Sequence, residues 1–149
     1  MFEPKKILVP TDFSASSDKA MQEAIDIAEK YHSKVYVLHV VDKGVQQCAA
    51  DYCLPNDVFE QFEHESVNAS TQKMKQEVSK MNHADAVEIS FDVKKGVPYD
   101  EILNEQQQND IDLIVMASHG RTGISRFMLG SVADKVVKKA NAPVLLVRG

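Results

Sequence analysis

The chain has 149 residues, of which 44% are hydrophobic and 26% are charged. This composition is that of an ordinary globular protein, excludes the disordered, collagen-like and membrane classes, and at this length predicts one domain over residues 1–149. The net charge of −5 argues against a general affinity for nucleic acid, so any phosphate binding is expected to be local.

The first predicted element is a short buried strand. Residues 5–10 (KKILVP) form an apolar run that ends at proline. Because this run is far too short for a signal-peptide core or a membrane span, we expect a cytoplasmic location. Thr11 to Ser14 then offer capping oxygens to a helix over about 16–31, in which apolar residues recur at helical spacing.

A central strand, a loop and a long helix come next. Residues 34–41 (KVYVLHVV) are almost continuously apolar, which is typical of a parallel strand covered on both faces. Residues 42–56 have no periodicity and predict a loop. Asn56 or Asp57 can cap a helix that reaches about residue 81. The apolar residues expected to be buried along it are Val58, Phe59, Phe62, Val67, Met74, Val78 and Met81.

The predicted loop contains the two cysteines of the chain, Cys48 and Cys53. In a reducing compartment such a pair indicates either free thiols or part of a metal site. With Asp51 or His64 it would make only an incomplete zinc shell, since structural zinc prefers four Cys or His ligands. Free thiols are therefore favoured, and no metal site is predicted.

The second half of the chain continues to alternate strand and helix. Apolar and polar residues alternate over 87–93, which indicates a strand near a sheet edge. The remaining predicted elements are a helix from about 96 to 108, a buried strand over 112–116, a helix over 131–140 and a strand over 143–147. This order predicts an open parallel α/β sheet with right-handed crossovers and helices on both faces. Ligands of such sheets bind beyond the carboxyl ends of the strands, which directs attention to the loops after Val9 and Met116.

The segment from Met116 to Ser131 carries the most chemistry. It leaves a buried strand and enters a helix, and its glycines Gly120, Gly123 and Gly130 permit close approaches of the backbone. The amides at the start of this helix and the positive end of its dipole suit a phosphate. The donors expected are the amides of Gly130, Ser131, Val132 and Ala133, with added charge from Arg121 and Arg126.

An alternative explains the same segment without a ligand. The glycines then only shape a turn, and Ser131 only caps the helix, with Asp134 completing a capping-box pattern. Asp134 favours this alternative, because a carboxylate in the first turn already complements the dipole and repels phosphate.

Four blocks of the sequence resemble those of the universal stress protein family. They are residues 5–14 (KKILVPTDFS), 38–42 (LHVVD), 112–123 (DLIVMASHGRTG) and 141–147 (NAPVLLV). The nucleotide-binding branch of that family is marked by G-x2-G-x9-G-[S/T]. This chain has Ala117 in place of the first glycine, then Gly120, Gly130 and Ser131 at the matching positions.

The resemblance implies a fold, a ligand and a set of contacts. The fold is an adenine nucleotide alpha hydrolase-like sheet of five strands in the order 3-2-1-4-5, and the ligand is ATP or AMP, with Mg²⁺ as an accompanying ion. Asp12 and the backbone of Pro10 and Thr11 would meet the adenine or ribose, with Val40 against the base. Asp12 lies just past the first strand and can accept from ribose hydroxyls, although it can also simply cap a helix. The other implied contacts are Met116 and Ala117 along the pocket, Gly120 and Arg121 at the phosphates, and Gly130, Ser131, Val132 and Ala133 as the residues that hold them.

His119 is the one candidate general base in the glycine-rich loop. We place it in the nucleotide site but expect no catalysis, because no nucleophile, carboxylate partner or metal triad accompanies it in the sequence. His39 lies in a buried strand and is expected to be a satisfied core residue. Neither a Walker motif nor G-x-G-x-x-G occurs, which disfavours P-loop hydrolysis and Rossmann dinucleotide binding.

The sequence thus favours a regulatory nucleotide-binding protein of the stress response. A weak ATPase or adenylate-handling enzyme and a nucleotide-free protein-interaction dimer are the alternatives. A flavodoxin-like carrier is disfavoured because residues 10–17 lack its Thr/Ser-Gly phosphate turn. The family's strand order puts the apolar last strand at a sheet edge, which would aggregate unless covered. The resemblance implies that the same strand of a second subunit covers it, so we expect a homodimer through this strand. The residues concerned are Pro143, Val144, Leu145, Leu146 and Val147.

Overall fold

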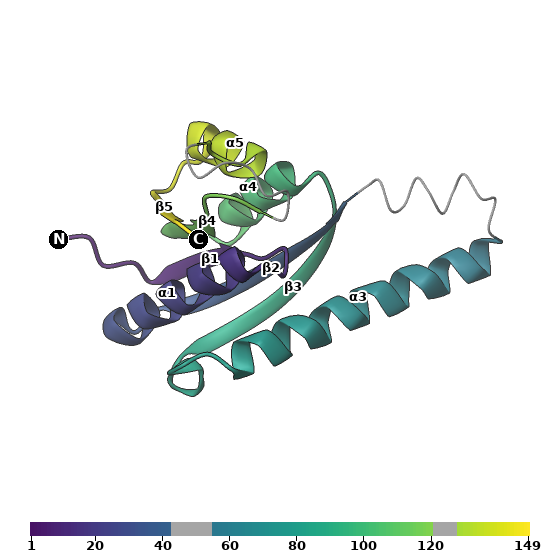
Figure 1. Ribbon diagram of the computed structural model, residues 1–149, viewed down its shortest axis with the longest axis horizontal. Helices are drawn as coiled ribbons and strands as arrows, with labels where there is room; N and C mark the ends of the chain where they lie inside the picture. The colour runs from purple at the N-terminus through teal and green to yellow at the C-terminus, as the bar shows by residue number, and fades with distance from the viewer. Residues whose placement is uncertain (43–54, 121–127) are drawn as a thin grey trace.

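Five parallel strands form the middle layer of the molecule, in the order β3-β2-β1-β4-β5 (Figure 1). They are β1 (Lys6–Pro10), β2 (Lys34–Asp42), β3 (Glu88–Gly96), β4 (Leu113–Ala117) and β5 (Val144–Val147). The α/β fold and the strand order expected from the sequence are confirmed. β3 lies at one edge of the sheet, as its alternating pattern predicted, and β5 lies at the other.

This computed structural model describes residues 1–42, 55–120 and 128–149, and the side chains of Asn56, Phe59 and Phe62 are not described. The predicted loop over 42–56, with Cys48 and Cys53, falls almost wholly outside these ranges. Arg121, Gly123 and Arg126 also lie outside the described residues. What the sequence predicts for all of them therefore stays a prediction.

The helices cover both faces of the sheet (Figure 1). They are α1 (Ala15–Tyr31), α3 (Asn56–Ser79), α4 (Pro98–Gln108) and α5 (Ser131–Lys139), with a 3-10 turn η1 (Ala84–Ala86) after α3. α1 and α3 pack on one face, and α4 and α5 pack on the other. Within the described residues, no helix is long and apolar enough to cross a membrane.

β1 explains why the central strands are apolar throughout. Ile7 and Val9 pack into the core on the side of α1 and α3, while Leu8 between them packs into the core on the side of α4 and α5. All three side chains are fully buried. Since successive side chains of a strand point to opposite faces, a strand between two helical layers needs apolar residues at every position.

α3 departs from the sequence prediction at its N-terminal end. Neither Asn56 nor Asp57 caps it: the N-cap is Pro55, whose side chain makes no hydrogen bond to the first turn. Met74 and Val78 are buried as predicted, but Val58 is 44% exposed. Figure 1 gives the reason, because the first turns of α3 run past the end of the sheet and meet no strand there. An apolar stripe predicts burial only where another layer lies opposite it.

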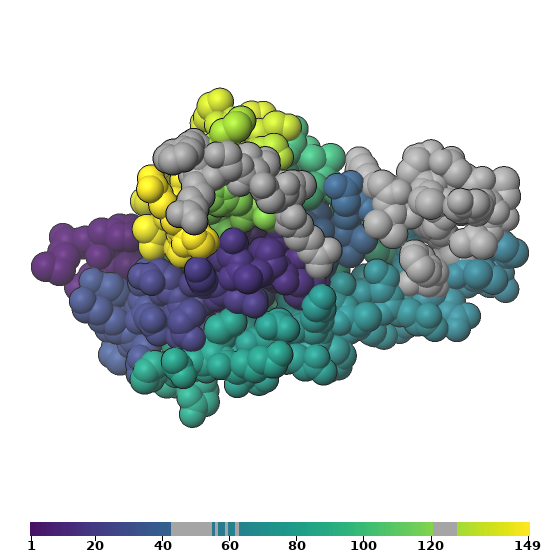
Figure 2. Space-filling view, in the orientation of Figure 1, coloured from purple at the N-terminus to yellow at the C-terminus, as the bar shows by residue number. Residues whose placement is uncertain are grey.

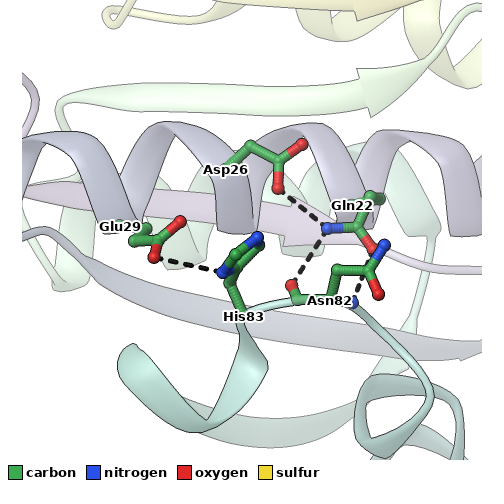
Figure 3. Close-up of polar contacts among 5 residues, drawn as sticks. All are labelled: Gln22, Asp26, Glu29, Asn82 and His83. Carbon is green, nitrogen blue, oxygen red and sulfur yellow. Dashed lines mark hydrogen bonds and ion pairs between the residues drawn. The ribbon is translucent and has the colours of Figure 1, made fainter.

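The C-terminal end of α3 is held against α1 by a set of polar contacts (Figure 3). The side-chain amide of Gln22 pairs with the backbone of Asn82: its Nε2 donates to the carbonyl oxygen at 3.0 Å, and its Oε1 accepts from the amide at 2.9 Å. His83 contacts Glu29 of α1 at 3.1 Å. These contacts fix the turn that leads from α3 to β3.

The C-terminal residues return to the start of α1. Gly149 lies directly beside Ser16, and in Figure 2 the yellow C-terminal residues adjoin the dark purple start of the chain. The first turn of α1 therefore sits next to the residue that ends the chain after β5. The two segments of the sequence that carry the family-like motifs, at the start and near the end of the chain, are brought into one region of the molecule.

Candidate functional site

A pocket of about 530 Å³ opens beyond the carboxyl ends of β1, β2 and β4. Because β1 connects to β2 on one side and pairs with β4 on the other, the pocket lies where the winding of the sheet reverses. The site residues that the sequence proposed in the described ranges all line it. These are Pro10, Thr11, Asp12, Val40, Met116, Ala117, His119, Gly120, Gly130, Ser131, Val132 and Ala133. Arg121 is the proposed site residue that lies outside the described ranges.

The turn after β1 forms one wall of the pocket and is held by its own hydrogen bonds. The backbone amide of Thr11 donates to the carbonyl oxygen of Leu38 at 2.8 Å, which extends the pairing of β1 with β2 by one step. The Thr11 hydroxyl accepts from the amide of Phe13 at 3.1 Å and lies 3.1 Å from the hydroxyl of Ser17. The turn is therefore tied both to the neighbouring strand and to the first turn of α1.

Asp12 lies in this turn and is not the helix cap that one interpretation of the sequence allowed. Ser14 caps α1, with its hydroxyl accepting from the amide of Ser17 at 3.1 Å. Asp12 Oδ1 instead accepts from the amide of Ser14 at 3.0 Å, a local turn of the kind that aspartate favours. The second carboxylate oxygen lies toward Gly120, since a Cβ on that glycine would come within 2.6 Å of it.

The start of α5 forms the opposite wall. Gly130 is the N-cap, and Ser131 is the first residue of the helix, so the prediction that Ser131 caps this helix is wrong. The reason is the backbone of Gly130, which is extended with φ −60° and ψ 152° and whose carbonyl oxygen already accepts from the amide of Asp134 at 2.9 Å. Asp134 forms an ion pair with Lys138 at 3.0 Å and completes no capping box.

The amides at this end of α5 differ in whether they are paired. The amide of Gly130 donates to the carbonyl oxygen of Ser118 at 2.7 Å and is occupied within the protein. For the amides of Ser131, Val132 and Ala133, the described residues supply no acceptor. The N-cap Gly130 has no side chain that could cap α5. Three donors at the positive end of a helix are therefore without an acceptor in the described part of the chain, and their residues line the pocket, an arrangement that suits an anion.

Gly130 is needed where it stands because the loop after β4 passes very close to it. A Cβ at this position would lie 3.1 Å from the carbonyl oxygen of Ser118 and 3.4 Å from the Cα of His119. A larger side chain would push the loop that carries Ser118 to Gly120 away from the start of α5. The glycine thus keeps the two sides of the pocket together.

His119 lines the pocket from the loop after β4. Its Nδ1 lies 3.0 Å from the hydroxyl of Ser118, while its Nε2 is buried without a hydrogen-bond partner among the described residues. A buried polar atom left unpaired costs about 1–3 kcal/mol. The short loop after β4 therefore holds a buried polar atom that the described part of the protein does not satisfy.

Several lining residues were missed by the sequence analysis. The start of α4 contributes Pro98 and Ile102, β2 contributes Val41 and Asp42, and Ser118 follows β4. A signal for α4 existed: a helix that follows a parallel strand begins at the carboxyl edge of the sheet, which is where the pocket lies.

His39 was predicted to be a satisfied core residue. Its Nδ1 is indeed paired, with the carbonyl oxygen of Thr11 at 2.8 Å, but the residue also lines the pocket.

The surroundings of the β1 turn are acidic. The pKa of Asp18, in the first turn of α1, is raised above its ordinary value, first by burial and next by the charge of Glu77. The charge of Asp12 also raises it, while Lys80 and Lys73 oppose the shift. Acidic side chains thus gather around the β1 turn and the start of α1, while the three amides without an acceptor lie at the start of α5.

The chain belongs to the universal stress protein family. The model of that family, described as "Universal stress protein family", matches residues 3–148. The universal stress protein MJ0531 of Methanocaldococcus jannaschii is 37% identical over 144 residues, which cover 97% of this chain and 82% of the relative. MJ0577 is a universal stress protein of the same organism. Its solved structure superposes on this chain with a TM-score of 0.83 at 27% identity, and the match covers 99% of this chain and 98% of that one.

Two solved relatives contain an adenine nucleotide. A universal stress protein in complex with cAMP has a TM-score of 0.69 at 21% identity, covering 99% of this chain and 98% of that one. The universal stress protein of Archaeoglobus fulgidus in complex with dAMP has a TM-score of 0.61 at 22% identity, covering 98% of this chain and 99% of that one. At these identities, the two structures share the fold with this chain.

Proposed function

We propose that this protein binds an adenine nucleotide, ATP or AMP, at the A-x2-G-x9-G-S loop and acts as a regulatory nucleotide-binding protein of the stress response. One observation carries the proposal: the amides of Ser131, Val132 and Ala133 have no acceptor among the described residues and face a pocket that Asp12 lines from the other side. A pocket of about 530 Å³ falls in the range usual for ligand sites.

In this proposal each wall contacts one part of the nucleotide. The base lies against apolar side chains such as Val40 and Met116, while Asp12 accepts hydrogen bonds from the ribose hydroxyls. The phosphates accept hydrogen bonds from the amides at the start of α5, and Arg121 is a further contact. A Mg²⁺ ion that accompanies ATP would be bound by the phosphate oxygens in this proposal.

The comparisons support the choice of nucleotide. Relatives with the same fold form complexes with cAMP and with dAMP, both of which contain adenine and one phosphate group. Ala117 stands where the family motif has its first glycine, and its methyl group lines the pocket. Because alanine is the smallest possible addition to glycine, we propose that the motif keeps its function here. We also propose that the protein acts in the cytoplasm.

The sharpest test removes a single proposed donor without harming the helix. Ser131 is the first residue of α5, where proline is tolerated, and the extended backbone of Gly130 before it is compatible with a following proline. Ser131→Pro should leave the melting temperature nearly unchanged and weaken ATP·Mg²⁺ about tenfold or more in calorimetry, since a hydrogen bond to a charged group is worth about 1.5–3 kcal/mol.

Ser131→Ala is the matched control, because it removes the hydroxyl and keeps the amide. It should bind ATP like the wild-type protein. Equal binding by Ser131→Pro would overturn the assignment of these amides to the phosphates.

A folded wild-type protein that gives no heat with ATP or AMP, and that purifies without adenine nucleotide, would leave the nucleotide-free dimer as the better description. Steady-state ATP turnover that His119→Ala abolishes would make the protein an enzyme.

We also propose a homodimer through β5. This strand lies at the edge of the sheet, carries only apolar residues, and leaves Leu145 37% exposed. An uncovered apolar edge is prone to pair with another chain, and the same edge of a second copy can cover it symmetrically. Sedimentation should give twice 16.6 kDa at micromolar concentration, and Leu145→Lys should give the monomer. A monomeric wild-type protein would contradict this proposal.

A further inference from the structure

We propose that His39 is a positioning residue of the nucleotide site: its Nδ1–H group holds the carbonyl oxygen of Thr11 and so fixes the turn that presents Asp12 to the pocket. This inference rests on the proposed function, because Asp12 is taken to contact the ribose. It assigns to His39 a role beyond that of a satisfied core residue.

The first step is the direction of the hydrogen bond. His39 Nδ1 lies 2.8 Å from the carbonyl oxygen of Thr11. Since a carbonyl oxygen only accepts, Nδ1 carries the hydrogen and donates. The amide of the same Thr11 donates to the carbonyl oxygen of Leu38. Leu38 and His39, which are successive residues of β2, therefore pair with the amide and the carbonyl oxygen of Thr11 just after β1.

The second step leads from Thr11 to Asp12. The peptide group between them is planar, so fixing the Thr11 carbonyl also fixes the direction in which the chain enters Asp12. On the other side of Asp12, Phe13 has a positive φ of 65°, which is rare for a bulky residue and persists only where the surroundings enforce it. The His39 ring supplies part of these surroundings, with its centroid 4.4 Å from that of Phe13.

His39 thus acts on both neighbours of Asp12, through a hydrogen bond before it and a ring contact after it. Phe13 has a second contact, because Lys73 of α3 places its ammonium group 4.4 Å from the centroid of the Phe13 ring. The space for Asp12 is narrow: a Cβ on Gly120 would come within 2.6 Å of Oδ2. A small rotation of the turn therefore changes where the carboxylate meets a ligand.

Two substitutions separate the hydrogen bond from the ring. His39→Asn keeps an N–H donor close to the position of Nδ1 and loses the ring, whereas His39→Phe keeps a ring and loses the donor. We expect His39→Phe to weaken ATP·Mg²⁺ about tenfold in calorimetry, and His39→Asn to stay within about threefold of the wild-type affinity. Equal losses in both variants, or wild-type affinity in His39→Phe, would overturn the proposal.

A control distinguishes positioning from a general loss of stability. Ser33, just before the other end of β2, donates its hydroxyl hydrogen to the carbonyl oxygen of Pro4 at 2.6 Å, far from the pocket. Ser33→Ala should lower the melting temperature and leave the affinity for ATP unchanged. If it weakens binding as much as His39→Phe does, the effect of His39 is one of stability and the proposal fails.

A measurement on the ligand-free protein separates this inference from the proposed function. The amides of Phe13 and Ser14 donate to Thr11 and Asp12 inside the turn, and hydrogen exchange reports how well that turn is held. His39→Phe should speed exchange at both amides and His39→Asn should not. If exchange is faster in His39→Phe but the wild-type protein binds no ATP, the proposed function alone is overturned. Unchanged exchange in His39→Phe, together with wild-type affinity of this variant for ATP, would overturn the role of His39 alone.

The step through Asp12 can be tested in the same assay. If His39 acts by aiming this carboxylate, adding His39→Phe to Asp12→Asn should change the affinity for ATP by less than about twofold, because the contact that His39 serves is already weakened. A further tenfold loss in the double variant would mean that His39 acts elsewhere, and would overturn the assignment.

Discussion

The two ends of the sheet differ in whether certain polar groups have hydrogen-bond partners. At the amino ends of the strands, the backbone amides of Lys5 and Lys6 both donate to Asp112 Oδ2, at 2.8 and 2.9 Å, and the Ser33 hydroxyl donates to a carbonyl oxygen. At the carboxyl ends, the three amides that open α5 have no acceptor among the described residues, and His119 Nε2 is buried there without a hydrogen-bond partner.

This difference indicates which end is built for stability and which for a ligand. Buried polar groups are normally paired, so a set of unpaired donors around a pocket needs an explanation, while a set of mutually paired groups does not. Substitutions at the amino end should therefore change the free energy of unfolding and not the affinity for nucleotide. Substitutions at the carboxyl end should do the reverse.

The largest effect is expected from Asp12 at the carboxyl end. Asp12→Asn keeps the Oδ1 acceptor for the amide of Ser14 but loses the negative charge. Hydrogen bonds to a charged group are worth about 1.5–3 kcal/mol, so the affinity for ATP should fall by roughly 10- to 100-fold in calorimetry. The melting temperature should stay within about one or two degrees of the wild-type value. Unchanged affinity would remove Asp12 from the site.

Asp112 provides the reciprocal experiment at the amino end. Asp112→Ala leaves the amides of Lys5 and Lys6 without their acceptor and should lower the free energy of unfolding by about 2 kcal/mol in urea titrations. Asp112→Asn retains one acceptor oxygen and should lose less. Neither variant should change the affinity for ATP by more than about twofold. A large loss of affinity in Asp112→Ala would show that the two ends are not independent.

The smallest effect concerns a buried acid away from both ends. The pKa of Glu105 in α4 is raised above its ordinary value, first by burial and next by the charge of Asp92. A raised pKa means that the folded protein disfavours the ionised form, so Glu105 lowers stability once the pH exceeds its ordinary pKa, and costs nothing well below it. The variant Glu105→Gln keeps the acceptor for Asn109 Nδ2.

Glu105→Gln should therefore raise the melting temperature at about pH 7, by roughly one or two degrees, and should have no effect near about pH 3. Calorimetric scans across this range measure the difference. The opposite sign, with a gain at acid pH that vanishes at neutral pH, would contradict the raised pKa. ATP affinity should be unchanged throughout, because Glu105 does not line the pocket.

Much of the fold could be predicted from local patterns. β1, β2 and β4 are apolar runs of strand length, and the helix over 15–31 has a capping serine and an apolar stripe, so each element agrees with its own sequence. The errors fell at the ends of helices. The caps of α3 and α5 were misassigned by one or two residues, because the backbone angles of Pro55 and Gly130 decide where each helix begins.

The candidate site could be predicted only in part. The glycine spacing and the motif residues located both walls, since the loops that follow parallel strands meet at one edge of the sheet. The glycine spacing did not include α4, although the position of this helix after a parallel strand was a usable signal for Pro98 and Ile102. The contact of His39 with the Thr11 carbonyl could not be predicted, because it joins residues that are far apart in sequence and no local pattern records it.

The sequence by itself determined the parallel α/β fold, the universal stress protein family and the two motifs at the carboxyl edge, because these depend on periodicity and residue type along short stretches. Only the tertiary structure decided which donors remain for a ligand. The amide of Gly130 is paired with Ser118, whereas those of Ser131, Val132 and Ala133 find no acceptor among the described residues. Whether a donor is paired depends on what packs beside it, and that is a property of the folded chain.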